Sequence, residues 1–142
     1  MNNLPSLALS IRQPWAWAII NAGKDIENRS WATKQRGPIC IHASQYKPRQ
    51  VDIDDFNETF RAAIPDEQDR AKICPRHTEA LSFHRGGIIG TAEIADCIES
   101  SESPWFFGSY GFVLRNVRPV EFVPVKGSLG FFDWRKNLEQ PQ

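Results

Sequence analysis

The segment of residues 9–31, LSIRQPWAWAIINAGKDIENRSW, constrains the fold more than any other part of this chain. Pro14 suits the first turn of a helix, where its missing N–H group costs nothing. Apolar side chains then follow at helical spacing and form one stripe, namely Trp15, Ala18, Ile19 and Ala22. Gly23 supplies a left-handed stop. The pattern therefore predicts a helix of about nine residues between Pro14 and Gly23.

The rest of the chain contains several strand patterns and one clear second helix. Strands are predicted at residues 7–11, 26–31, 38–43, 87–98, 110–116 and 120–126, with Pro124 placing the last one at a sheet edge. The stripe Ile53, Phe56, Phe60 and Ile64 predicts a helix that ends at Pro65. Its acidic side chains, within residues 52–69, are typical of a solvated face. Residues 66–85 are predicted to be loop with one short helix.

These elements predict a single domain over residues 1–142. The fold class is α+β, a small β-barrel of five to six mixed strands with two main flanking helices.

Composition excludes several classes of protein. No apolar run approaches the roughly 20 residues of a membrane span, and the N-terminus lacks the features of a signal peptide. A cytoplasmic protein without a membrane partner is therefore expected. Cys40, Cys74 and Cys97 are odd in number and far apart, which argues against disulfides. Cys74 and His77 form a lone C-x-x-H pair, so neither a metal nor a cofactor is predicted.

Basic and acidic residues are equal in number but unevenly distributed. Residues 1–50 contain seven basic and two acidic residues, residues 51–104 contain five and twelve, and residues 105–142 contain five and three. This distribution suggests an electropositive face around the opening segment. Such a face suits a partner that carries phosphates.

Lys24, Glu27 and Arg29 are the leading candidates for a functional site. In an extended strand, Glu27, Arg29 and Trp31 point to one face because side chains alternate. Lys24 lies in the turn after the helix and can point to the same cleft. Arginine and lysine suit phosphates or base edges, and a glutamate accepts from an exocyclic amine. A structural reading stays open, in which Lys24 neutralises the helix end and Glu27 pairs with Arg29.

Four further residues are candidates for the same cleft. Trp31 offers an indole on which a base can stack, and Arg12 is a candidate phosphate contact. Gln13 either reads a base edge or satisfies free N–H groups at the helix start. His42 either lines the cleft or is a structural histidine.

The order of these motifs resembles a known family. The sequence LS-x-x-QPWA, then GK-x-x-E-x-R-x-W, then RG before a strand, then G-x-x-G-x-A-E-x-x-D-C, is similar to the ASC-1 homology (ASCH) domain. The C-terminal VKGSLGFFDW resembles the end of small bacterial stand-alone members. The resemblance covers about Leu9 to Trp134 and implies a PUA-like pseudo-barrel with a cleft on one side. It also implies nucleic-acid binding, transcription coactivation or nucleotide hydrolysis.

The leading functional prediction is a protein that binds RNA, another single-stranded nucleic acid or a modified nucleoside in a cleft formed by residues 12–31. DNA is an alternative partner. The second prediction is a hydrolase in which Lys24, with a lowered pKa, is the base or nucleophile and Glu27 moves the proton. One ASCH-like branch resembles an N4-acetylcytidine amidohydrolase that uses a lysine and a threonine, but Glu27 stands at the threonine's position here. A ribonuclease with Lys24 as phosphate clamp is the other hydrolytic prediction.

A third prediction is a protein-interaction module that recruits partners through exposed aromatic side chains. Trp105 and Phe106 are adjacent in a loop, where they form either a plug for the barrel end or a platform for a base. The sequence predicts neither an oligomeric state nor a sequence preference.

Overall fold

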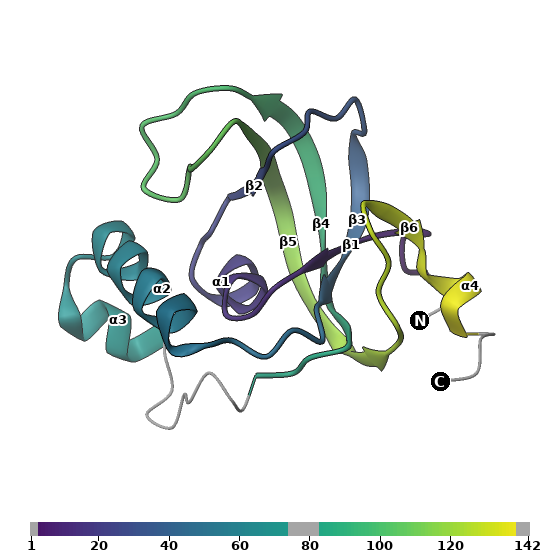
Figure 1. Cartoon of the computed structure of the whole chain (residues 1–142), viewed down its shortest axis with the longest axis horizontal. Helices are drawn as coiled ribbons and strands as arrows, with labels where there is room; N and C mark the ends of the chain where they lie inside the picture. The colour runs from purple at the N-terminus through teal and green to yellow at the C-terminus, as the bar shows by residue number, and fades with distance from the viewer. Residues whose placement is uncertain (1–2, 74–82, 139–142) are drawn as a thin grey trace.

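The computed structural model describes residues 3–73 and 83–138, in which six strands form one curled sheet (Figure 1). The strands are β1 (Leu7–Ile11), β2 (Ile26–Arg29), β3 (Gly37–Ala43), β4 (Gly87–Ile98), β5 (Tyr110–Pro124) and β6 (Phe131–Asp133). Their order is β2-β5-β4-β3-β1-β6, and only β1 and β3 pair in parallel. The sheet is a half-barrel with β2 and β6 at its edges. The predicted α+β class and the mixed small barrel are confirmed.

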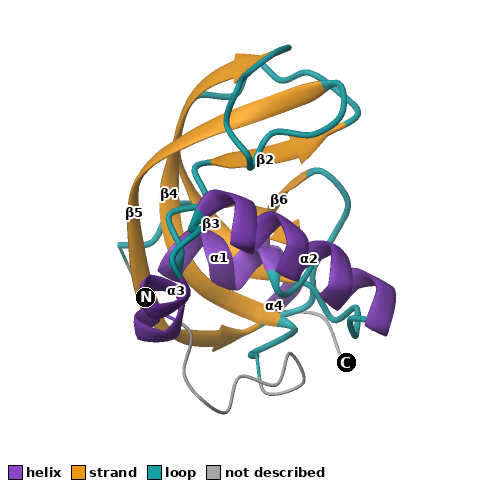
Figure 2. Ribbon diagram, turned by 90° about the vertical axis from the view of Figure 1, so that its left-hand side faces the viewer, coloured by secondary structure: helices purple, strands orange, loops and turns teal. Residues whose placement is uncertain are grey.

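Within residues 3–73 and 83–138, four helices accompany the sheet, namely α1 (Trp15–Asn21), α2 (Gln50–Ala63), α3 (Glu67–Ile73) and α4 (Trp134–Leu138). Helix α1 lies in the hollow of the curled sheet, and α2 lies beside α1 in both views (Figures 1 and 2). The two predicted main helices are confirmed, and α3 is the short helix expected within residues 66–85. Sequence patterns do not predict β6 or α4, because elements of three and five residues are too short to show a periodicity.

The end of α1 sets the direction of the chain into the sheet. Gly23 has a φ of +71°, as a left-handed stop requires. The backbone N–H groups of Ala22 and Lys24 both donate to the carbonyl of Ala18, at 2.8 and 3.2 Å. The turn is therefore fixed by main-chain bonds, and Lys24 leaves it at a defined point just before β2.

Two apolar clusters position the helices. The main core between α1 and the sheet contains Leu9, Ile11, Ala16, Ile19, Ile39, Ile41, Ala43, Ala92, Ile94, Phe112 and Leu114. A second cluster joins α1 and α2 to the loop before β5, and contains Ala18, Ala22, Ile26, Phe56, Phe60 and Trp105. Trp105 is buried in this cluster, so its side chain fills the interior and offers no platform. The second cluster fixes α2 relative to β2.

Residues 110–116 and 120–126 were expected to form two strands, and this expectation is wrong. They belong largely to one strand, β5, which bends at Asn116 with a φ of +53° and shifts its register against β4 at three places. Strand β2 pairs only with residues 110–113, so the remainder of β5 is a sheet edge. Pro119 and Pro124 are tolerated in one continuous strand because an edge leaves room for residues without an N–H donor.

Candidate functional site

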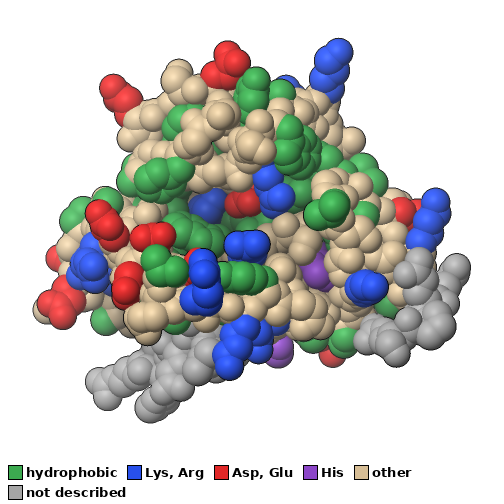
Figure 3. All heavy atoms as spheres, viewed as in Figure 1, with side chains coloured by type: hydrophobic (Ala, Val, Ile, Leu, Met, Phe, Trp, Pro, Cys, Tyr) green, Lys and Arg blue, Asp and Glu red, His purple; other side chains and the backbone are tan. Residues whose placement is uncertain are grey.

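A pocket of about 1100 Å³ opens beside α1, between β2 and α2. Figure 3 shows it as a hollow that contains basic and acidic side chains. The pocket is lined by Ser10, Ile11, Arg12, Trp15, Lys24, Glu27, Asn28, Arg29, Ser30, Trp31, Ser44, Asp55, Glu58, Thr59, Ala62, Ser103, Pro104, Phe106, Phe107, Ser128, Leu129 and Gly130. Distant parts of the sequence therefore build one cavity around the opening segment.

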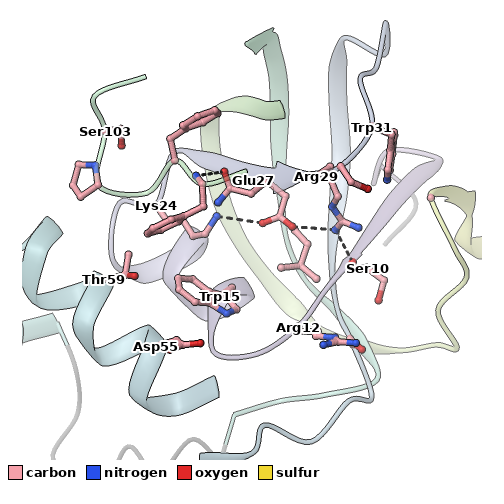
Figure 4. Close-up of a pocket in the computed structure, with 18 of the residues that line it drawn as sticks. Ser10, Arg12, Trp15, Lys24, Glu27, Arg29, Trp31, Asp55, Thr59 and Ser103 are labelled. Atoms are coloured by element: carbon pink, nitrogen blue, oxygen red, sulfur yellow. Dashed lines mark hydrogen bonds and ion pairs between the residues drawn. The ribbon is translucent and has the colours of Figure 1, made fainter. Parts of the chain in front are cut away.

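Lys24, Glu27 and Arg29 form a continuous chain of ion pairs in the pocket, which we call the charged floor (Figure 4). Glu27 Oε1 lies 3.2 Å from Lys24 Nζ, and Glu27 Oε2 lies 3.0 Å from an Arg29 guanidinium nitrogen. The side chains of Lys24 and Glu27 are 2% and 10% exposed. The predicted convergence of the turn residue with the strand residues is what the structure shows.

Burial dominates the electrostatics of Lys24. The ammonium group donates to the carbonyl of Ile26 and to Glu27, and it lies 5.9 Å from the centre of the Trp15 ring. Loss of water lowers the pKa of Lys24, and the adjacent Glu27 carboxylate offsets only part of this effect. An ammonium group has three donors, and two of them have partners among the described residues, so one remains for a ligand.

Arg29 completes the floor and keeps an unused donor. Its Nη2 donates to the carbonyl of Ser10 at 2.9 Å and forms the ion pair with Glu27 Oε2 at 3.0 Å. Its Nε atom is buried and has no hydrogen-bond partner among the residues that the structure describes. A buried N–H group without a partner costs about 1–3 kcal/mol, so a ligand acceptor at this point would recover favourable energy.

Helix α2 forms the opposite wall of the pocket. Asp55, Glu58 and Thr59 line it, and Figure 4 shows Asp55 and Thr59 projecting from this helix toward the charged floor. Asp55 and Glu58 are exposed, in agreement with the expected solvated face, and they line the pocket as well. Thr59 is 7% exposed and lies three residues after Phe56. A polar residue on an apolar helical stripe was the signal that could have identified it.

Aromatic and apolar side chains form the rim. Trp31 is 36% exposed, and its ring packs edge-on against Phe112 at 5.2 Å and Phe131 at 5.7 Å. Phe107 and Leu129 are 51% and 98% exposed and come from two different loops. The aromatic rings of this rim offer flat, partly solvent-exposed surfaces on which a base can stack.

The side chain of Asn28 fastens one of these loops to β2. Its Nδ2 donates to the carbonyl of Trp105 at 2.9 Å, and its Oδ1 accepts from the backbone N–H of Phe107 at 2.8 Å. Both polar ends of one amide thus hold the rim in place. Sequence reasoning missed Asn28 because its partners lie 77 and 79 residues away.

The remaining predicted site residues separate into two groups. Arg12 lines the pocket, whereas Gln13 and His42 do not. Gln13 Oε1 accepts from the backbone N–H of Trp17 at 2.8 Å, and its Nε2 donates to the carbonyl of His84 at 2.9 Å. This is the helix-start role that the sequence left open for Gln13.

His42 is 1% exposed and has two internal partners. Its Nε2 lies 2.8 Å from the carbonyl of Val125, and its Nδ1 lies 2.9 Å from Ser10 Oγ. A carbonyl can only accept, so Nε2 carries the proton, and the neutral Nδ1 accepts from the Ser10 hydroxyl. Burial lowers the pKa of His42 and favours this neutral form. The structure thus places His42 in the structural role that the sequence left open.

The described residues contain no group of three or more side chains that could hold a metal ion. Cys74 and His77, the C-x-x-H pair, lie outside the described residues. Cys40 and Cys97 are free thiols. Within the described part of the chain, no helix has the length and apolar character to cross a membrane.

Comparisons with known proteins agree with the motif resemblance. The sequence model described as the ASCH domain matches residues 9–121, a range that includes the charged floor and the α2 wall. Activating signal cointegrator 1 of Homo sapiens is 26% identical over 136 residues, and that of Mus musculus is 26% identical over 131 residues. Each match covers 84% of this chain and 21% of the relative. The chain thus spans about one fifth of the length of the curated relatives it matches.

Proposed function

We propose that this chain, which belongs to the ASCH domain family, binds RNA in the pocket above its charged floor. ASCH domains are associated with RNA binding. The observation that carries the proposal is that two buried side chains, Lys24 and Glu27, and the half-buried Arg29 pair with one another in an open pocket of about 1100 Å³.

The stability of the folded state does not by itself explain why three charged side chains lie together in the pocket. Removing charges from water costs several kcal/mol for each ion, and their mutual attraction often fails to recover that cost. Apolar side chains of similar size would fill the same space at least as favourably. A ligand supplies the missing reason, because the floor keeps free hydrogen-bonding capacity on all three residues.

The free groups match the edge of a base. Lys24 retains one donor, Arg29 Nε is an unpaired donor, and each Glu27 oxygen has a second lone pair. A carboxylate flanked by donors can accept from an exocyclic amine while the donors contact carbonyl or ring acceptors. Trp31 and Phe107 at the rim supply surfaces for stacking.

The test is RNA binding measured by fluorescence anisotropy at several salt concentrations. The wild type is expected to bind single-stranded RNA with an affinity that falls as salt rises. Lys24→Met removes one floor charge with little change in volume and is expected to lower the affinity at least about tenfold. Lys34→Met is the matched control, since Lys34 is exposed and lies outside the pocket. Equal affinities for wild type and Lys24→Met would contradict the proposal.

A second candidate function is hydrolysis of a modified nucleoside or of RNA, as with N4-acetylcytidine. The lowered pKa of Lys24 favours it, because a partly deprotonated amine can act as base or nucleophile. Thr59 also lines the same pocket, although the third position after Lys24 is Glu27. Turnover of N4-acetylcytidine or of an RNA oligomer, followed by chromatography, tests it. Lys24→Arg, which keeps the charge but cannot deprotonate, should abolish turnover and retain binding.

Two finer points belong to the same proposal. We propose RNA rather than DNA as the partner. DNA oligomers of equal sequence provide the comparison in the binding assay. A cytoplasmic location is also proposed, because the free thiols of Cys40 and Cys97 suit a reducing compartment. Localisation of a fluorescent fusion tests the second point.

A further inference from the structure

The charges that line the pocket divide into paired and unpaired groups. Three of the six charged side chains belong to the charged floor and neutralise one another in part. The other three are Arg12, Asp55 and Glu58, and none of them has a hydrogen bond or ion pair to any residue in the described ranges. With respect to the described part of the chain, the pocket thus offers one unpaired cation and two unpaired carboxylates.

Arg12 is held in position without using its donors. Its guanidinium carbon lies 3.9 Å from the centre of the Tyr46 ring. The Tyr46 hydroxyl in turn donates to Asp52 at 2.6 Å and accepts from Arg49 Nε at 2.9 Å. A stacked guanidinium keeps its in-plane N–H groups available for a phosphate. Tyr46 is therefore a positioning residue for a single anion contact.

The α2 wall has the opposite charge. Asp55 and Glu58 are three residues apart and lie on one face of α2. Figure 4 shows Arg12 and Asp55 well apart on the same side of the charged floor, with Arg12 below its Arg29 end and Asp55 on α2 below its Lys24 end. Carboxylates repel phosphates, but they accept well from ribose hydroxyls, as in dinucleotide-binding folds. A polyphosphate or a continuous backbone across this wall meets two uncompensated negative charges.

We propose that the pocket accepts one ribonucleotide residue that carries a single phosphate. The phosphate lies on Arg12, the base lies over the charged floor, and the ribose hydroxyls face Asp55 and Glu58. This inference rests on the proposed function and names its ligand class. A strand of RNA enters only with a terminal or splayed-out nucleotide, because the chain cannot continue over the acidic wall. A free nucleoside monophosphate presents the same chemistry.

Calorimetric titration with the four ribonucleosides and their mono- and triphosphates tests this assignment. For the preferred base, the monophosphate is expected to bind about tenfold tighter than the nucleoside, since bonds to charged groups are the strong ones. The triphosphate and the 2′-deoxy monophosphate are expected to bind several-fold weaker than the ribonucleoside monophosphate. A six-nucleotide RNA in the same titration distinguishes a strand end from a free nucleotide as the source.

Variants separate the two walls. Arg12→Gln should abolish the preference for monophosphate over nucleoside, whereas Arg36→Gln, at an exposed position outside the pocket, should keep that preference as in wild type. The double variant Asp55→Asn, Glu58→Gln should raise triphosphate affinity at least about threefold and weaken discrimination against the deoxy ligand. Tyr46→Leu should reproduce part of the Arg12→Gln effect, and Tyr46→Phe, which keeps the ring, should restore most of the preference.

Three results would overturn the inference. They are equal affinity for nucleoside and monophosphate, an unchanged preference in Arg12→Gln, and unchanged triphosphate affinity in the Asp55 and Glu58 double variant. Binding of the RNA oligomer without binding of any monophosphate would overturn the inference and leave the proposed function standing. Binding of neither would overturn both.

Discussion

Two buried polar clusters meet at Ser10, and they differ in what they leave unsatisfied. The histidine cluster joins His42 to the Ser10 hydroxyl and to the carbonyl of Val125. The charged floor bonds the carbonyl of the same Ser10 through Arg29. The imidazole has a partner at each ring nitrogen and is neutral, whereas the floor carries three charges and a buried N–H group with no partner.

This difference shows that burial of a polar side chain is not by itself a sign of function. A neutral group whose donors and acceptors all have partners stabilises the fold, and no ligand is needed to explain its burial. A charged group with unused hydrogen-bonding capacity in an open pocket carries a desolvation cost that folding does not recover, so ligand binding is the better explanation for its presence. Alteration of the histidine cluster should therefore lower stability but not ligand affinity, whereas alteration of the charged floor should affect ligand affinity as well.

The largest expected effect is the loss of the counter-charge in the floor. Glu27→Gln leaves a buried ammonium and a guanidinium side by side, and should lower the free energy of unfolding by about 3 kcal/mol or more. Urea denaturation measures it. Glu58→Gln, at an exposed position on the same pocket, should change stability by less than about 0.5 kcal/mol. If Glu27→Gln unfolds at the wild-type urea concentration, the floor does not act as a coupled charge cluster.

The second prediction concerns the histidine cluster. His42→Ala removes a donor from the carbonyl of Val125 and a packed ring, and should lower the free energy of unfolding by about 2–4 kcal/mol. RNA affinity of the folded variant should stay within about twofold of wild type, which anisotropy measures well below the melting temperature. His84→Ala is the control, with an exposed side chain and an expected loss below about 1 kcal/mol. A selective loss of RNA affinity in His42→Ala would place this residue in the site after all.

The third prediction uses pH to separate the clusters. The folded pKa of His42 lies below its ordinary value near 6.5, so between these two values only the unfolded chain binds the proton. Stability should therefore fall as pH drops below about 6.5, by at most about 1.4 kcal/mol per pH unit for one group. Urea midpoints at pH 7.5, 6 and 5 should show this slope in wild type. His42→Gln should lose it, because the other histidines are common to both proteins.

The smallest expected effect concerns the rim beside the floor. Asn28→Ala removes the bonds to the carbonyl of Trp105 and the N–H of Phe107, and should lower stability by about 1–2 kcal/mol. The exchange rate of the Phe107 amide proton should rise, which NMR hydrogen exchange measures. Asn28→Asp keeps the acceptor for Phe107 and should retain part of that protection. Unchanged exchange in Asn28→Ala would show that the loop is held by packing alone.

Much of the fold follows from local pattern. The start and stop of α1, the stripe of α2 and the strand at 87–98 each contain enough residues to show a period or a breaker. The continuity of β5 cannot be read from a local pattern. It depends on which residues of β5 pair with β2, and only residues 110–113 of the described strand do so. The short elements β6 and α4 exist because Phe132 and Trp134 are buried against the rest of the sheet, and burial by distant residues leaves no local periodicity.

The candidate site divides in the same way. The relative positions of Lys24, Glu27 and Arg29 follow from segment 12–31 alone, because a glycine stop followed by a strand with alternating side chains brings the three within reach of one another. Residues on α2 and on the loop at 103–107 join them only through packing. A sequence can show which side chains a helix or strand presents, but it cannot show which distant element stands opposite.

The sequence by itself determined the charged floor and the helix that aims it, because those contacts are separated by only two to five residues. Only the tertiary structure decided that the floor faces the acidic wall of α2, that Arg12 rests on Tyr46, and that Gln13 and His42 lie outside the pocket. The physical reason is range. Local hydrogen bonds and side-chain alternation act over a few residues, whereas the pairing of walls depends on how apolar clusters far apart in the chain pack against each other.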